Sequence, residues 1–166
     1  MWARQKPVFA ASALAAALAC ASPQGPAPAL PRPPAPSPSR AQLERADVVR
    51  AAESLVGAPY RYGGRSPAGF DCSGLVQYSF ARAGIHGLPR SAEDLEIAAA
   101  PVDLEGIRPG DLLFFRLDRK RTTHVAIYVG GRSFVHAPSR GKRVERVDFD
   151  HVYWGPRLVR AGRILE

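Results

Sequence analysis

The spacing of apolar residues predicts helices in the first half of the folded part of the chain. Between residues 42 and 56, apolar side chains recur every three or four positions, which indicates a helix that ends at Gly57-Ala58-Pro59. Residues 60–71 contain three glycines and a proline and are expected to form a loop. Residues 72–83 again have a helical pattern, with Gly84 as the stop signal.

The pattern changes after Pro109-Gly110. Short runs rich in β-branched and aromatic residues, separated by turn signals, predict strands at residues 111–116, 123–129, 133–137, 143–149 and 158–164. Helices followed by strands favour an α+β fold with an antiparallel sheet.

The N-terminal part has a different character. Residues 1–19 are typical of an export signal peptide, with Arg4 and Lys6 before an apolar run that is too short to span a bilayer. Residues 20–40 are rich in proline, alanine and serine, which predicts an extended tether and not a folded segment. The folded domain is therefore expected over residues 41–166, and the mature protein is expected to have no transmembrane helix.

Cys20 directly follows the small-residue cleavage pattern Ala17-Leu18-Ala19. This arrangement resembles a bacterial lipoprotein signal, although Ala17 occupies the place of the usual leucine. The resemblance implies lipidation of Cys20 and a location in the cell envelope, anchored to the membrane. Simple cleavage after Ala19, without a lipid, is the alternative.

Charge and cysteine content restrict the other classes of protein. The formal net charge of +8 favours acidic partners, but the basic residues are scattered and no basic run alternates with aromatics, so nucleic-acid binding is not predicted. Two cysteines are too few for a disulfide-stapled domain, although a single Cys20–Cys72 bridge is conceivable. The dispersed histidines lack the spacing of metal ligands, and no cofactor is implied.

Cys72 has the sequence context of a reactive thiol. It lies between Asp71 and Ser73, after the glycine-rich loop and at the start of a predicted helix. Unpaired N–H groups and the helix dipole at such a position favour a thiolate, so we expect a lowered pKa. A buried, inert cysteine is the alternative.

Two of the four histidines lie in consecutive predicted strands, His124 in 123–129 and His136 in 133–137. A cysteine nucleophile needs a base and a group that orients the base, and strands hold side chains within narrow tolerances. His86 and His151 lie in loops and are not candidates.

Several motifs, in order, resemble blocks of the NlpC-type cell-wall cysteine peptidases. They are Gly57-Ala58-Pro59-Tyr60-Arg61-Tyr62-Gly63-Gly64, Phe70-Asp71-Cys72-Ser73-Gly74-Leu75-Val76, Pro89-Arg90-Ser91-Ala92, Pro109-Gly110-Asp111-Leu112-Leu113-Phe114-Phe115, His124-Val125-Ala126-Ile127-Tyr128-Val129-Gly130 and Phe134-Val135-His136-Ala137. The similarity extends over about residues 47–165.

This resemblance implies a papain-like α+β fold, with N-terminal helices packed on a five- to six-stranded antiparallel sheet. It also implies cleavage of amide bonds in peptidoglycan stem peptides, typically between γ-D-glutamate and the diamino acid. Cys72 would attack the carbonyl, His124 would take the thiol proton, and His136 would orient His124. A catalytically inactive wall-binding module, or an amidase or acyltransferase of the same fold, is the alternative.

The resemblance assigns five further residues to the substrate. The hydroxyl of Tyr60 would lie near the oxyanion, Asp71 and Ser73 would bind the amino end of the substrate, and Arg90 and Ser91 would contact the stem peptide. Each has an ordinary structural alternative: Asp71 can serve only as a helix cap, and Arg90 can be a solvated surface charge.

The turn between the two histidines is a geometric test. Side chains alternate faces along a strand, and paired residues share a face. A two-residue Gly130-Gly131 hairpin would place His124 and His136 on opposite faces. An odd-length loop, or a bulge that shifts the register by one, would pair Ala126 with His136 and bring both imidazoles to one face. We therefore predict one of these two irregular turns.

Overall fold

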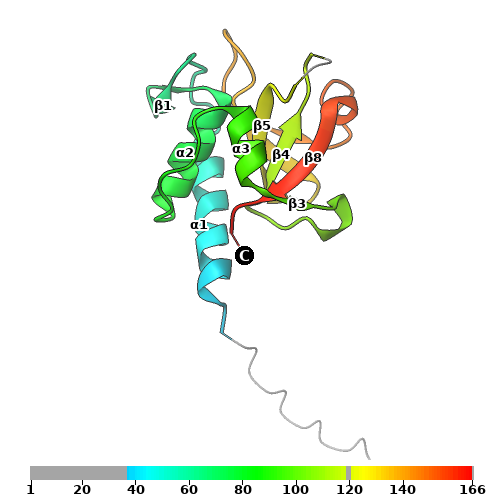
Figure 1. The fold of residues 1–166 in the computed structure, drawn as a ribbon. Coiled ribbons are helices and arrows are strands. Elements are labelled where there is room, and N and C mark those ends of the chain that lie inside the picture. Colours follow the sequence, from blue (N-terminus) through cyan, green and yellow to red (C-terminus); the bar gives the residue numbers. More distant parts are fainter. Residues whose placement is uncertain (1–36, 119–120, 166) are drawn as a thin grey trace, which may run out of the picture. The chain divides into compact units, whose positions relative to one another are not determined.

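A computed structural model describes residues 37–118 and 121–165 of the chain (Figure 1). The predicted signal peptide, Cys20 and most of the predicted tether lie outside these residues. The part of the chain from Ser37 onward forms one compact unit. Within the described ranges, every helix is too short or too polar to cross a membrane.

Three α-helices begin at side-chain caps. Helix α1 (Arg40–Ser54) starts at a capping box of Ser39 and Gln42, α2 (Cys72–Arg82) at Asp71, and α3 (Ala92–Ala98) at Ser91. The first two confirm the predicted helices, with ends that shift by two residues or fewer. Helix α3 lies where the sequence led to no prediction. Among the described residues there are also two 3₁₀ turns, Leu104–Gly106 and Gly155–Arg157.

The main sheet has six antiparallel strands in the order β3-β8-β4-β5-β6-β7. The strands are β3 (Ala100–Val102), β4 (Leu112–Phe115), β5 (His124–Gly130), β6 (Ser133–His136), β7 (Glu145–Asp148) and β8 (Leu158–Arg163). All five predicted strands are confirmed, and β3 adds a sixth strand at one edge. A small pair, β1 (Arg65–Ser66) with β2 (Gly69–Phe70), forms within the segment that was predicted to be a loop.

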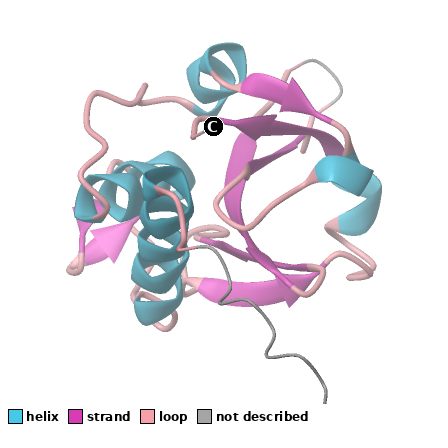
Figure 2. Cartoon of the chain, turned by 90° about the horizontal axis from the view of Figure 1, so that it is seen from below, coloured by secondary structure: helices cyan, strands magenta, loops and turns pink. Residues whose placement is uncertain are grey.

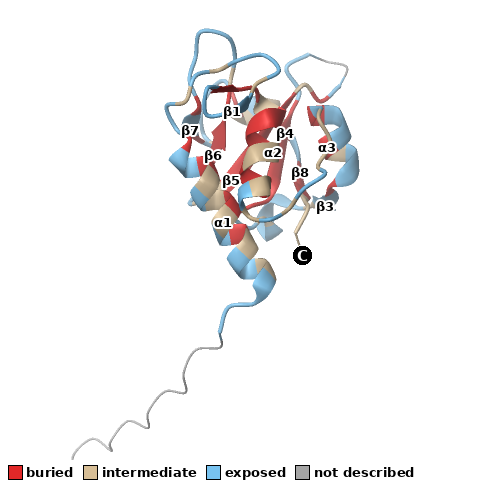
Figure 3. Cartoon of the chain, turned by 90° about the vertical axis from the view of Figure 1, so that its left-hand side faces the viewer, coloured by how far each residue is buried: buried red, intermediate tan, exposed pale blue. Residues whose placement is uncertain are grey.

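The two faces of the sheet bury two different clusters. Helices α1 and α2 pack side by side against one face of the curved sheet (Figures 2 and 3). Alternate residues such as Phe114 and Val125 point to that face and join the helices in one core cluster. The intervening residues, among them Phe115 and Phe134, form a second cluster with Trp154 on the opposite face. This alternation follows from the two-residue period of a strand.

The β5–β6 hairpin has the irregular turn that the sequence predicts. Tyr128 pairs with Phe134, but the next pair is Gly130 with Ser133, so the hairpin contains a one-residue bulge. Counting two residues back from Tyr128 and two forward from Phe134 places Ala126 opposite His136, which is the predicted register. The bulge, and not an odd-length loop, produces it.

Candidate active site

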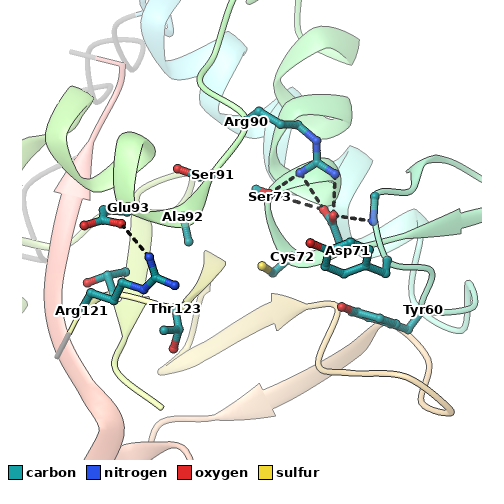
Figure 4. Close-up of a pocket in the computed structure, with 13 residues that line it drawn as sticks. Tyr60, Asp71, Cys72, Ser73, Arg90, Ser91, Ala92, Glu93, Arg121 and Thr123 are labelled. Carbon is teal, nitrogen blue, oxygen red and sulfur yellow. Dashed lines mark hydrogen bonds and ion pairs between the residues drawn. The ribbon is translucent and has the colours of Figure 1, made fainter. Parts of the chain in front are cut away.

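Cys72 is the first residue of α2 and lines a pocket of about 590 Å³ (Figure 4). The pocket wall comes from the glycine-rich loop, the start of α2, the start of α3 and the segment before β5. Its residues are Tyr60, Tyr62, Gly63, Asp71, Cys72, Ser73, Arg90, Ser91, Ala92, Glu93, Arg121, Thr122 and Thr123. All five predicted substrate-contacting residues therefore lie around the same cavity as Cys72.

Close backbone packing fixes the first turn of α2. Asp71 accepts hydrogen bonds from the backbone N–H groups of Gly74 (2.7 Å) and Gly63 (2.9 Å), so it is the predicted N-cap. A Cβ atom on Gly74 would lie 2.0 Å from the carbonyl oxygen of Gly64. Glycine at residue 74 thus allows the loop to pass directly over the helix start and holds Cys72 at its place.

The environment of the Cys72 thiol differs from the sequence expectation. Burial raises the pKa of the thiol, and this effect outweighs the backbone hydrogen bonds of Val125, Ser73 and Cys72 itself, which favour the thiolate. The prediction of a lowered pKa was therefore wrong, because the sequence reveals the helix start but not how far the sulfur is withdrawn from water. The hydrogen bond with the backbone of Val125 places the sulfur beside the second residue of β5, which directly follows His124 in the sequence.

His124 and His136 form a hydrogen-bonded pair. The distance between Nε2 of His124 and Nδ1 of His136 is 2.8 Å, and both residues are buried. Burial lowers the pKa of His124 to about 3 and that of His136 to about 2, so both rings are neutral at neutral pH. The prediction that the two histidines share a face and lie within hydrogen-bond reach is confirmed.

Trp154, which was not predicted as a site residue, covers this histidine pair. Its ring stacks on His124 at a centroid distance of 4.9 Å and meets His136 edge-on at 4.4 Å. Phe115 and Phe134 contact the same two imidazoles from the sheet. The histidines are thus embedded in an aromatic cluster that excludes water, which accounts for their low pKa values.

Arg90 and Asp71 form the polar side of the pocket (Figure 4). The Arg90 guanidinium donates to both carboxylate oxygens of Asp71 and also to the hydroxyl of Ser73. Arg90 is therefore paired and not merely a solvated surface charge. Tyr60 lies near Cys72 on the same side, and burial raises the pKa of its phenol, which keeps the hydroxyl protonated.

Ser91 lies toward the other end of the pocket, where it caps α3 through the backbone N–H of Asp94. Glu93 and Arg121 form an ion pair at this end of the cavity, with a distance of 3.8 Å between Oε2 and Nη1 (Figure 4). Neither residue was predicted from the sequence. Their only signal was position, since Glu93 follows the Arg90-Ser91 motif and Arg121 lies three residues before His124.

Within the described ranges, no cluster of three or more His, Cys, Asp or Glu side chains could hold a metal ion.

Comparison with known proteins places this geometry in a family. The chain is 35% identical over 132 residues to the murein DD-endopeptidase MepH of Escherichia coli (76% of this chain, 49% of the relative), and 44% identical over 121 residues to the bifunctional muramidase/DL-endopeptidase CwlT of Bacillus subtilis (70% and 36%). The chain spans about a quarter to a half of the length of the curated relatives that it matches.

The fold is also similar to that of solved structures. An NlpC/P60 family protein from Bacillus cereus superimposes with a TM-score of 0.70 and 29% identity, over 79% of this chain and 42% of that one. This likeness confirms the expected papain-like α+β fold. Residues 57–163 match the NlpC/P60 family, and this segment contains Cys72, both paired histidines and every pocket residue. The chain belongs to the NlpC/P60 family.

Proposed function

We propose that this protein is a cysteine peptidase that hydrolyses amide bonds in peptidoglycan stem peptides. The observation that carries the proposal is the placement of Cys72 at the start of α2, beside β5, together with the 2.8 Å hydrogen bond between His124 and His136. A thiol, a base and a group that orients the base are the three components that cysteine-dependent amide hydrolysis needs.

In this mechanism the two nitrogens of His124 have different partners. Nε2 is engaged by His136, so Nδ1 is the nitrogen left to receive the proton of the Cys72 thiol. The sulfur then attacks the substrate carbonyl carbon, and protonated His124 returns the proton to the leaving amine. Water hydrolyses the resulting thioester with His124 as the base. Burial disfavours both the thiolate and the imidazolium, so the resting site contains a neutral thiol and a neutral imidazole.

The pocket supplies groups for the developing charge and for the substrate. The protonated hydroxyl of Tyr60 and the backbone N–H at the start of α2 are suitable donors for an oxyanion. Asp71 and Ser73 are suited to an ammonium group at the amino end of a stem peptide, with Arg90 holding the carboxylate in place. Ser91, at the far wall, would contact the next part of the peptide.

For the bond that is cut, we propose the link between γ-D-glutamate and the diamino acid. Support comes from CwlT, whose name describes a DL-endopeptidase, and from the family motifs around Cys72. MepH is named a DD-endopeptidase, and the fragments released in the digestion distinguish the two kinds of bond.

The test is digestion of purified peptidoglycan, with the released muropeptides identified by mass spectrometry. Wild-type protein should release fragments that end in D-glutamate. Cys72→Ser should lose nearly all of this activity, because a serine hydroxyl is a much weaker acid and a weaker nucleophile than a thiol. Ser79→Ala, a change on the same helix outside the pocket, is the matched control and should stay active.

The alternatives give different results. A wall-binding module would sediment with peptidoglycan but release no fragments from it. An amidase or acyltransferase would leave stem peptides intact and act on another envelope amide or lipid. Substantial turnover by Cys72→Ser would remove the thiol mechanism.

We also propose that the protein acts outside the cytoplasm, anchored to a membrane by a lipid on Cys20. Support comes from the position of Cys20 directly after the predicted signal peptide. Cys20→Ala should move the protein from the membrane fraction to the soluble envelope fraction. Recovery of soluble wild-type protein that begins at an unmodified Cys20 would contradict the anchor.

A further inference from the structure

A carboxylate lies directly behind the histidine pair. Glu145, on the edge strand β7, is the cross-strand partner of His136, so both side chains project from the same face of the sheet. Its Oε1 atom is 3.3 Å from Nε2 of His136. Nε2 itself is buried, and no other group in the described part of the chain forms a hydrogen bond with it.

The contact is close but not ideally aligned. The distance between Oε1 and Nε2 is within the range of an ion pair, but the contact does not have the geometry of a good hydrogen bond. Glu145 is 48% exposed and can rotate, whereas His136 is fixed within the aromatic cluster. A small rotation of the carboxylate would therefore give the buried Nε2 a hydrogen-bond partner. A buried donor or acceptor without a partner destabilises the folded state by about 1–3 kcal/mol.

The proton arrangement of two neutral histidines has only two solutions. Each neutral imidazole carries one N–H, and the Nε2–Nδ1 contact needs one donor and one acceptor. Either His124 donates through Nε2, which leaves its Nδ1 bare, or His136 donates through Nδ1, which forces the proton of His124 onto Nδ1. Only the first arrangement gives His124 a lone pair that can accept the thiol proton of Cys72.

An ionised carboxylate can accept a hydrogen bond but cannot donate one. Beside Nε2 of His136 it favours the N–H at that nitrogen. His136 then has a bare Nδ1 and must accept from His124. The hydrogen bond at one nitrogen sets the tautomer at the other, and the effect passes through both rings.

We propose that Glu145 is a positioning residue that selects the base-competent tautomer of His124 through His136. The inference rests on the proposed function for its catalytic consequence, but the tautomers themselves are a property of the resting protein. Glu145 lies on the opposite side of the histidine pair from Cys72 and outside the pocket that contains the thiol.

The direct test is nitrogen NMR of the imidazole rings in full-length, ¹⁵N-labelled protein near neutral pH. Wild-type protein should have Nε2–H on both His124 and His136. Glu145→Ala should populate Nδ1–H on His136 and, with it, Nδ1–H on His124. A wild-type His136 that carries Nδ1–H, or tautomers that are the same in Glu145→Ala, would overturn the inference.

Kinetics provide a second readout. Glu145→Ala should lower kcat about tenfold or more, which is the usual scale for removing a partner that orients a functional histidine, with little change in KM. Glu145→Gln keeps an acceptor oxygen and should fall between the wild-type protein and the alanine variant. A glutamine variant as slow as the alanine variant would contradict the acceptor argument.

Arg146→Gln is the matched control. Arg146 is the next residue on β7, is equally exposed (48%), faces the other side of the sheet and pairs with Glu53. It should leave both tautomers and kcat unchanged. If the wild-type protein cleaves no peptidoglycan, the proposed function fails, and the NMR result still decides the role of Glu145.

Discussion

The buried carboxylate of Asp111 should determine much of the stability of the domain. Asp111 lies directly before β4 with its side chain 0% exposed. It accepts hydrogen bonds from Arg45 on α1 (2.9 Å), from the backbone N–H of Arg108 (2.8 Å) and from Arg163 on β8 (2.9 and 2.7 Å). One carboxylate thus links the first helix to the centre and the last strand of the sheet.

Asp111→Asn keeps the size of the side chain and removes its charge. The amide retains one acceptor oxygen and turns an NH₂ group toward guanidinium donors, so about two charge-assisted hydrogen bonds are lost at roughly 1.5–3 kcal/mol each. Arg163 is 19% exposed and can turn to water, whereas Arg45 is almost fully buried and is left uncompensated. We expect the free energy of unfolding to fall by about 3–4 kcal/mol, which is within the range for breaking a buried ion pair.

The same network predicts how stability depends on pH. Burial alone would raise the pKa of Asp111, but the hydrogen bonds from Arg163 and Arg45 outweigh it and hold the pKa below its ordinary value of 3.8. A depressed carboxyl pKa stabilises the folded state above the pKa of the unfolded chain, and this contribution is lost as the pH falls through the folded-state value. The difference in free energy of unfolding between wild type and Asp111→Asn should therefore be constant above about pH 5 and become smaller below about pH 4.

Urea unfolding at pH 7 and pH 3 measures both effects. Thermal unfolding at pH 7 is a second measurement. Its midpoint should fall by roughly 10 °C in the variant, because each kcal/mol corresponds to roughly 3–4 °C in a domain of this size. Arg146→Gln, which breaks the exposed pair with Glu53, is the control and should cost less than about 1 kcal/mol. A loss below 1 kcal/mol for Asp111→Asn, or an undiminished difference at pH 3, would refute the reasoning.

One labelling experiment and two substitutions test the site further. Iodoacetamide should label Cys72 more slowly than free cysteine at pH 7, because burial raises the thiol pKa; faster labelling in mildly acidic buffer would restore the helix-start argument. Gly74→Ala should abolish turnover and destabilise the fold in thermal unfolding, because its Cβ would meet the Gly64 carbonyl at 2.0 Å. Trp154→Ala should lower the free energy of unfolding by about 3–5 kcal/mol. It should also raise the pKa of both His124 and His136, because the ring that shields them from water is removed. Unchanged imidazole titrations by NMR would contradict that cause.

The order of helices and strands was predictable because each element carries its own periodicity. The apolar spacing of residues 42–56 and the β-branched runs after Pro109 need no tertiary information. Helix α3 was missed although a local signal exists, since Ser91 and Asp94 have the spacing of an N-terminal cap. Strand β3 has three residues, includes Pro101 and owes its existence to pairing with β8, which no local pattern reveals.

The candidate site also contains residues that the sequence predicts and residues that it does not. Cys72, His124 and His136 could be identified from their motifs, and their common face followed from counting residues around a turn. The remaining contacts depend on connections whose register the sequence does not fix. Residues 137–144 lead from β6 to β7, and only their folded path places Glu145 opposite His136. Trp154 reaches the histidines from an irregular segment with no period at all.

The two faces of the sheet explain why the site lies at the end of a hairpin. Both histidines project into the aromatic cluster with Phe115, on the face away from the helices, while Cys72 comes from α2 on the other face. Side chains on opposite faces cannot meet in the middle of a sheet. His124 is the first residue of β5 and His136 the last of β6, so both lie where the hairpin ends. There the sulfur can approach around the strand terminus, as its contact with Val125 indicates. The bulge near Val129 is therefore what brings the two histidines together: with a regular register they would lie on opposite faces of the sheet.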